Sequence, residues 1–255
     1  MDSQVFIVSA GAAGQIVRHQ GDFVVVRAVL EQIKLVAQRV NVTSPRLVAV
    51  GKTFPAESTE NCYAAGQQHF GENYIQELEE KAALLSSKCP DIKWHYIGRV
   101  QSSKIKKLCA IPNLWCVETI ENRKHCEIFE KCLSELNKQL NIFVQVNTSG
   151  EANKGGTEPK ELNSLVEYIL QKCPNLKFKG LMTIGSISES KNSEKNEDFD
   201  LLRKLKSDIC SKFGLSSEAV ELSMGMSTDF ELAIEYGSTN VRVGSSIFGA
   251  RHYPK

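Results

Sequence analysis

The order of apolar and polar positions divides the chain into short strand-like runs separated by longer helical ones. Residues 46–51, RLVAVG, form the first run, in which consecutive apolar residues indicate a buried strand. Similar apolar or β-branched runs recur to the end of the chain. We therefore expect eight strands, at 46–51, 68–71, 92–97, 113–117, 142–147, 177–183, 219–223 and 240–244.

Amphipathic helices are predicted around these strands. Apolar residues recur at helical spacing in 22–42, 72–86, 158–172 and 227–236. In the last of these, Ser227 or Thr228 is the expected N-cap, and Thr228 with Glu231 fits a capping box.

Eight strands that alternate with helices are typical of an α/β protein, the (β/α)8 or TIM barrel. We expect one barrel domain over 21–255 and a flexible N-terminal extension over 1–20. A doubly wound open sheet is the alternative. It is disfavoured because no G-x-G-x-x-G sequence follows the first strand.

Composition narrows the class of partner. The net charge of +1 creates no field that would attract nucleic acid or an acidic membrane. The eight cysteines form no C-x-x-C pair, so we predict no metal site and expect reduced thiols, as in a reducing compartment. The N-terminal stretch has no secretory pattern, and no run reaches the ~20 apolar residues of a membrane span. We expect a cytoplasmic protein.

Candidate functional residues follow from the architecture, because a barrel of this type has its site at the carboxyl ends of the strands. Polar residues lie in or just after most of the predicted strands. They are Lys52, Asn73, His95, Asn147, Thr183 and Ser223.

Lys52 ends the first strand. Alone, a lysine in this position is a solvated loop residue. In a partly dry pocket, however, an amine loses its proton more readily and attacks carbonyl groups. That second environment is the one a Schiff base with an aldehyde cofactor requires.

Arg242 lies between Val241 and Val243 in the last strand. If the valines face the helices, Arg242 points into the barrel, because successive side chains alternate. A buried guanidinium needs a partner. The partner is either a barrel glutamate or a bound ligand.

A phosphate site is predicted from the loops after the last two strands. Gly244 and Ser245 follow the eighth strand, and SMGMS, 223–227, follows the seventh. Small residues allow close backbone approach, and their N–H and hydroxyl groups suit a phosphate. The loops after strands seven and eight commonly hold phosphate in such barrels.

Several segments together resemble one known family, from about residue 45 to the C-terminus. They are LVAVGKT, HFGENYIQEL, IKWHYIGRVQSSK, VQVNTSGEANKGG, LKFKGLMTIGS and ELSMGMSTDFELAIEYGSTNVRVGSSIFGAR. These segments resemble the pyridoxal phosphate homeostasis protein family. The resemblance implies a barrel of the alanine-racemase type that holds pyridoxal 5′-phosphate (PLP) on a lysine.

In this sequence the matching lysine is Lys52. By resemblance, the phosphate-binding positions are the serines and glycines of SMGMS and VGSS, and Arg242 lies near the pyridine nitrogen. The residues expected to contact the cofactor are Lys52, Asn73, His95, Asn147, Ser223, Met224, Ser227, Arg242, Gly244 and Ser245.

The expected function is to carry or buffer PLP in vitamin B6 homeostasis, through a Schiff base on Lys52. Racemases with this barrel take a second base from an added β-domain of a partner subunit. Here the chain ends at Lys255, soon after Gly244, so we expect a monomer with no catalytic residue. A positive Arg242 would also disfavour protonation of the pyridine ring and slow carbanion chemistry.

PLP-accepting apo-enzymes are the expected partners. Two alternatives stay open. The first is a PLP-dependent amino-acid racemase of low activity, with His95 as an acid–base group. The second is a barrel that binds another phosphorylated metabolite without a Schiff base.

Overall fold

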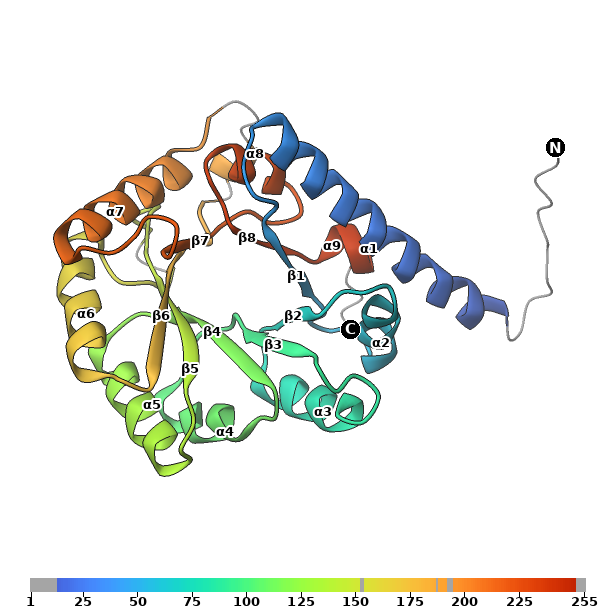
Figure 1. The fold of residues 1–255 in the computed structure, drawn as a ribbon. Helices are drawn as coiled ribbons and strands as arrows, with labels where there is room; N and C mark the ends of the chain where they lie inside the picture. The colour runs from blue at the N-terminus through green and yellow to red at the C-terminus, as the bar shows by residue number, and fades with distance from the viewer. Residues whose placement is uncertain (1–12, 152–153, 187, 192–194, 251–255) are drawn as a thin grey trace.

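Eight parallel strands close into a barrel in the computed structural model (Figure 1). The structure describes residues 13–151, 154–186, 188–191 and 195–250, with side chains from residue 22 onward. The strands are β1 (Arg46–Val50), β2 (His69–Glu72), β3 (Lys93–Tyr96), β4 (Leu114–Ile120), β5 (Leu140–Gln145), β6 (Leu176–Met182), β7 (Glu221–Ser223) and β8 (Asn240–Val243).

Every expected strand is present within a few residues of its predicted bounds, and the predicted (β/α)8 barrel is confirmed. The decisive pairing is between the first and last strands, where Arg46 lies opposite Asn240 and Ala49 lies opposite Val243. An open sheet would leave these two strands as edges, so the doubly wound alternative is wrong.

Helices follow the strands and form the outer layer of the barrel (Figure 1). They are α1 (Ala13–Arg39), α2 (Ala56–Ala64), α3 (Ile75–Leu85), α4 (Ile105–Ala110), α5 (Arg123–Glu135), α6 (Pro159–Lys172), α7 (Glu197–Phe213), α8 (Phe230–Glu235) and α9 (Ser245–Phe248), with 3-10 turns η1 (Ser102–Lys104) and η2 (Glu189–Lys191).

Helix α1 begins at Ala13, earlier than the pattern at 22–42 indicates, so part of the expected N-terminal extension is helical. The rest of that extension, residues 1–12, lies outside the described residues. Helix α1 packs against α2, α8 and α9 on the outside of the barrel (Figure 1). Within the described residues, no helix is long and apolar enough to cross a membrane.

The capping box expected at the start of α8 is wrong. The N-cap is Asp229, whose carboxylate accepts from the N–H of Met226 at 2.6 Å. Glu231 instead accepts a hydrogen bond from Gln32 of α1. The Ser227 hydroxyl accepts from backbone N–H groups after β8. The polar residues before α8 therefore join loops rather than cap the helix.

The main core lies between the strands and the helices. Val241 and Val243 of β8 were expected to face the helices and therefore to lie in this core. Val241 and Val243 are fully buried in this layer, and Arg242 between them is also buried. A smaller apolar cluster of Cys116, Phe143 and Met182 is separate from it. All eight cysteines are free in this structure.

Gly180 offers a direct test of the packing between β6 and β7. A Cβ at this position would lie 1.9 Å from the backbone oxygen of Glu221, and its φ is +154°. Gly66 also has a positive φ, of +96°, but has nothing within 4 Å of that point. We expect Gly180→Ala to destabilise the protein by about 1–3 kcal/mol more than Gly66→Ala, because only Gly180 is sterically blocked.

Urea unfolding of the two variants measures this difference. Equal losses of stability would show that the strand contact at Gly180 does not restrict this position.

Candidate functional site

A cavity of about 260 Å³ lies at the carboxyl end of the barrel. This volume is slightly below the ~300 Å³ at which typical small-molecule sites start, so the cavity has room for only a small ligand. The residues that line it are Val50, Lys52, Asn73, Ile97, Met182, Ile184, Met226, Ser227, Thr228, Arg242, Gly244 and Ser245. The structure therefore brings together six of the sequence-predicted residues, namely Lys52, Asn73, Ser227, Arg242, Gly244 and Ser245.

Lys52 is half-buried in the turn that follows β1. A buried lysine of α3, Lys81, fixes this turn. Its ammonium donates to the Gly51 carbonyl at 2.8 Å and to Glu77 at 2.8 Å. The same Glu77 oxygen accepts from the Thr53 N–H at 2.6 Å. Both backbone neighbours of Lys52 are thus tied to one buried charge cluster.

Glu72, at the end of β2, is the third member of this cluster. It is fully buried and accepts from the Lys81 ammonium at 2.7 Å. Burial raises the pKa of Glu72 to about 7, although the charges of Lys81 and Lys52 oppose this shift. A Cβ on Gly51 would lie 3.1 Å from a Glu72 oxygen, so a larger residue before Lys52 would crowd the cluster.

This cluster was not predicted from the sequence, although the sequence contains one signal for it. Glu77 and Lys81 are spaced i,i+4, which supports a helix ion pair. Leu78 and Ala82 place the buried stripe of α3 directly beside Lys81. A lysine next to a buried stripe with an acid one turn earlier is a candidate for a buried pair.

Arg242 is buried and lines the cavity, and of the two partners considered for it the structure shows the barrel glutamate. Its Nη1 donates to the Ser223 hydroxyl at 2.6 Å, and its Nη2 donates to the Thr183 carbonyl at 2.7 Å. The Ser223 hydroxyl in turn donates to Glu118 at 2.6 Å. Burial lowers the pKa of Arg242, and the charge of Glu118 counteracts that shift. A barrel glutamate therefore balances the guanidinium that faces the cavity.

His95 does not line the cavity but lies deeper in the barrel. Burial lowers the pKa of His95, so we assign a neutral ring. Its Nδ1–H then donates to Glu118 at 2.5 Å, and its Nε2 accepts from the Nδ1–H of His69 at 2.8 Å. The role of His95 in this structure is to hold Glu118.

Glu118 is the centre of this network and was not identified from the sequence, where the fourth strand was ended at residue 117. Burial alone would raise the pKa of Glu118. The hydrogen bond from His95, the charge of Arg242 and the Ser223 hydroxyl instead lower it to about 2. Glu118 therefore remains a carboxylate at neutral pH, which the positive Arg242 requires.

Backbone donors gather at the end of β8. The N–H groups of Gly244 and Ser246 point to the Ser227 hydroxyl oxygen at 3.1 and 3.3 Å. A Cβ on Gly244 would lie 3.2 Å from the Val50 carbonyl, so glycine lets β8 and β1 approach closely. The donors already point to an oxygen atom at the cavity wall, and a phosphate oxygen suits the same geometry.

Three other predicted residues lie outside the lining. Ser223 contacts Arg242 from below, and Met224 is fully buried. The Asn147 side chain donates to the Glu151 carbonyl at 3.1 Å and so holds its own loop. These residues support or surround the site without facing it.

Asn73 provides evidence that the cavity suits a ligand. Its Oδ1 is buried and has no hydrogen-bond partner among the described atoms. An unpaired buried acceptor is costly, and a donor on a ligand would relieve that cost. The lining therefore combines a lysine amine, a buried cation, backbone N–H groups and an unpaired acceptor.

Known proteins with similar sequences identify the family of this chain. The sequence model of the alanine racemase N-terminal domain family matches residues 24–252. The pyridoxal phosphate homeostasis protein of Caenorhabditis elegans is 56% identical over 211 residues, covering 82% of this chain and 86% of the relative. That of Bos taurus is 48% identical, covering 95% and 92%. The chain belongs to the pyridoxal phosphate homeostasis protein family.

Solved structures agree with this family assignment. PipY of Synechococcus elongatus without PLP has a TM-score of 0.73 and 31% identity, covering 84% of this chain and 98% of PipY. PipY with PLP bound has a TM-score of 0.71 and 29% identity, with the same coverage. An alanine racemase of Clostridium difficile, at 13% identity and a TM-score of 0.67, covers 93% of this chain and 60% of the racemase. It shows that the barrel is of the alanine-racemase type.

Removing the Lys81 ammonium should destabilise the fold strongly. In Lys81→Met, Glu72 and Glu77 would lose their shared cation inside the protein. We expect a loss of about 3–5 kcal/mol in urea unfolding, as for other broken buried pairs.

The matched control is Lys88→Met. Lys88 pairs with Glu60 at 2.8 Å on the surface, and the Lys88 side chain is 58% exposed. Its loss should cost less than about 1 kcal/mol. Similar losses in the two variants would contradict a buried role for Lys81.

Glu118 predicts a specific acid dependence of stability. Its pKa is about 2 in the folded protein against an ordinary value of 4.5. The stability it contributes is complete above about pH 4.5 and is lost as the pH falls toward 2. Glu118→Gln should flatten the pH profile in this window while lowering stability at pH 7.

Thermal unfolding across pH 2–6 measures this effect. The exposed Asp208→Asn variant is the control and should keep the profile of the unchanged protein. A Glu118→Gln profile as steep as that of the unchanged protein would refute the assignment.

Proposed function

We propose that this protein binds PLP in the cavity at the carboxyl end of the barrel and carries or buffers it in vitamin B6 homeostasis. One observation supports this most directly. Lys52, Arg242 and the β8 end at Gly244 line the same small cavity, although they are distant in sequence. Relatives of the same family carry this function in their names, and PipY binds PLP in a similar fold.

Each part of the cofactor has a complementary group. The phosphate would be held by Ser227, Ser245 and the N–H groups after β8, and the ring nitrogen would face Arg242. The Lys52 amine, in its neutral form, would add to the aldehyde carbon and release water to form a Schiff base. Water reverses this bond, so the hold is covalent but temporary, as a carrier requires.

The lining favours a carrier over the racemase alternative. A racemase needs two acid–base groups, one on each face of the substrate carbon. Among the lining residues that the structure describes, Lys52 is accompanied by no carboxylate, histidine, cysteine or tyrosine. The positive Arg242 also disfavours a protonated ring. These features favour binding and release over bond breaking.

The proposed partners follow from the proposed binding of PLP, and the proposed location follows from the cysteines. PLP-accepting apo-enzymes would receive the cofactor, and the protein would act as a monomer. The eight free thiols support a reducing compartment, so we place it in the cytoplasm. We propose no nucleic-acid or membrane partner.

The visible spectrum tests the cofactor and its anchor. Protein mixed with PLP should become yellow, and borohydride should trap a pyridoxyl group on Lys52. Lys52→Ala should lack both the band and the trapped group, because it removes the amine. Lys124→Ala, which changes an exposed lysine of α5, should keep both.

A protein that stays colourless and takes up no PLP would overturn the proposal and leave a barrel for another phosphorylated metabolite. Trapping at Lys52 together with measurable racemisation of amino acids would favour the enzyme alternative.

A further inference from the structure

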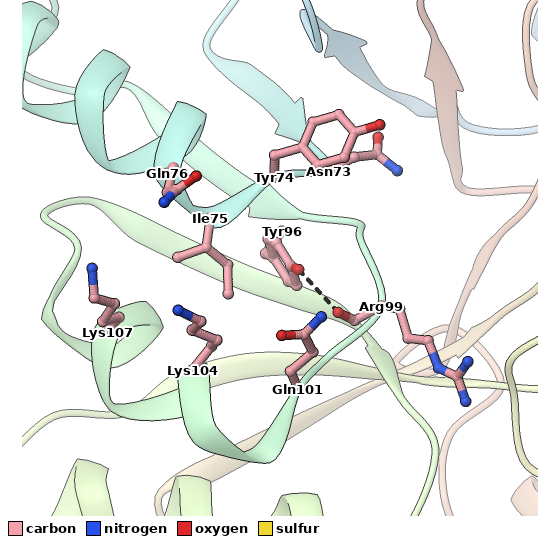
Figure 2. A pocket seen from close by; sticks show the side chains of 9 residues that line it. All are labelled: Asn73, Tyr74, Ile75, Gln76, Tyr96, Arg99, Gln101, Lys104 and Lys107. Atoms are coloured by element: carbon pink, nitrogen blue, oxygen red, sulfur yellow. Dashed lines mark hydrogen bonds between the residues drawn. The ribbon is translucent and has the colours of Figure 1, made fainter.

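A second cavity, of about 330 Å³, lies beside the first at the same end of the barrel (Figure 2). It is formed by the loops that follow β2 and β3 and by the start of α4. The residues that line it are Asn73, Tyr74, Ile75, Gln76, Tyr96, Arg99, Gln101, Lys104 and Lys107. Its size is within the range of small-molecule sites, ~300–1,000 Å³.

The charged residues that line this cavity are all basic. Arg99, Lys104 and Lys107 line it, and no carboxylate is among the lining residues. Lys107 pairs with Glu79 at 3.2 Å, and Arg99 lies 3.8 Å from Glu121 with 78% of its side chain exposed. Lys104 makes no ion pair with any residue that the structure describes. In a chain with a net charge of +1, this is a local excess of positive charge that favours an anion.

The middle of the cavity, beside Tyr96, can hold an aromatic ring. Figure 2 shows Tyr96 between the Tyr74–Ile75 segment and Gln101. The Tyr96 hydroxyl donates to the Arg99 carbonyl at 3.0 Å, and burial raises the pKa of Tyr96 to about 12. Tyr96 is therefore a neutral, fixed wall. A ring against Tyr96, with its phosphate toward Lys104 and Lys107, fits this arrangement.

Asn73 connects the two cavities, because it lines both. Its buried Oδ1 has no described hydrogen-bond partner. The two loops also meet closely, since a Cβ on Gly98 would lie 1.9 Å from the Asn73 carbonyl oxygen. Asn73 therefore marks the boundary between the two cavities.

We infer that the second cavity is a separate, non-covalent site for a phosphate ester of an aromatic ring, the chemical class to which PLP belongs. Lys104 and Lys107 bind the phosphate, and Tyr96 with Ile75 packs against the ring. Naming this ligand class rests on the proposed function. A PLP molecule that leaves Lys52 would find a holding site next to the first cavity, with Asn73 between them.

The test counts a second ligand after the first site is blocked. The full chain is loaded with PLP and reduced with borohydride, so that Lys52 is occupied. Equilibrium dialysis then measures binding of pyridoxine 5′-phosphate, which lacks the aldehyde and cannot react with lysines. We expect one further equivalent to bind.

Lys104→Met/Lys107→Met should weaken this binding by at least about tenfold, because charge-assisted contacts to phosphate are lost. Lys106→Met is the matched control. Lys106 is exposed on the same helix but does not line the cavity, so this variant should bind like the unchanged protein. Both lysines of the double variant are exposed, and equal urea midpoints would show that its fold is intact.

No further equivalent, or equal binding by the double variant, would overturn the inference. A glutamate-rich peptide that binds at Lys104 and Lys107 while the phosphate ester does not would also overturn it, and would assign the surface to an acidic protein segment. Failure of the proposed function is distinguishable, since it would appear earlier as the absence of a borohydride-trapped group on Lys52.

Discussion

The balance of charge around Arg242 is the constraint on which the interior of the barrel depends. A guanidinium cannot be buried without compensation, because removing it from water costs more than the fold can supply. The Ser223 hydroxyl links the guanidinium to a carboxylate, because it accepts a hydrogen bond from Arg242 and donates one to Glu118. His95 and Asn240 complete the surroundings of Glu118. The barrel centre is therefore a polar network, and the cation that faces the cavity is held in a fixed position.

A second buried network holds the turn after β1, the strand that pairs with β8. Lys81 joins the turn around Lys52 to Glu72 at the end of β2 and to Glu77 at the start of α3. The candidate nucleophile and the candidate ring partner thus rest on separate charge clusters. The Arg242 cluster is hydrogen-bonded within the protein, whereas the Oε2 atom of Glu72 in the Lys81 cluster is buried with no hydrogen-bond partner among the described atoms.

This arrangement supports the retention and release that we propose for the site. The lining contains one amine that can bond reversibly to an aldehyde and donors that fit a phosphate. The acid–base groups of the interior, His69, His95 and Glu118, are engaged with one another. A neighbouring basic cavity shares Asn73 with the first. Two adjacent sites of related chemistry would let a carrier hold its cargo beyond the covalent step.

The sequence by itself determined the barrel and the candidates at its mouth. The pattern of apolar residues located all eight strands. A strand of a parallel sheet is buried on both faces, so its sequence is a nearly continuous run of apolar residues. Lys52, Arg242 and Gly244 were predicted as site residues because they lie in or just after those strands. The tertiary structure alone decided which polar residues face the cavity. Glu118 and Ser223, or Glu72 and Lys81, are brought together by barrel closure and helix packing, and local pattern does not record contacts between residues so far apart. His95, Asn147 and Met224 were expected to contact the ligand, but they lie outside the cavity lining. A position near the end of a strand sets how far along the barrel axis a side chain lies, but it does not determine which residues that side chain contacts.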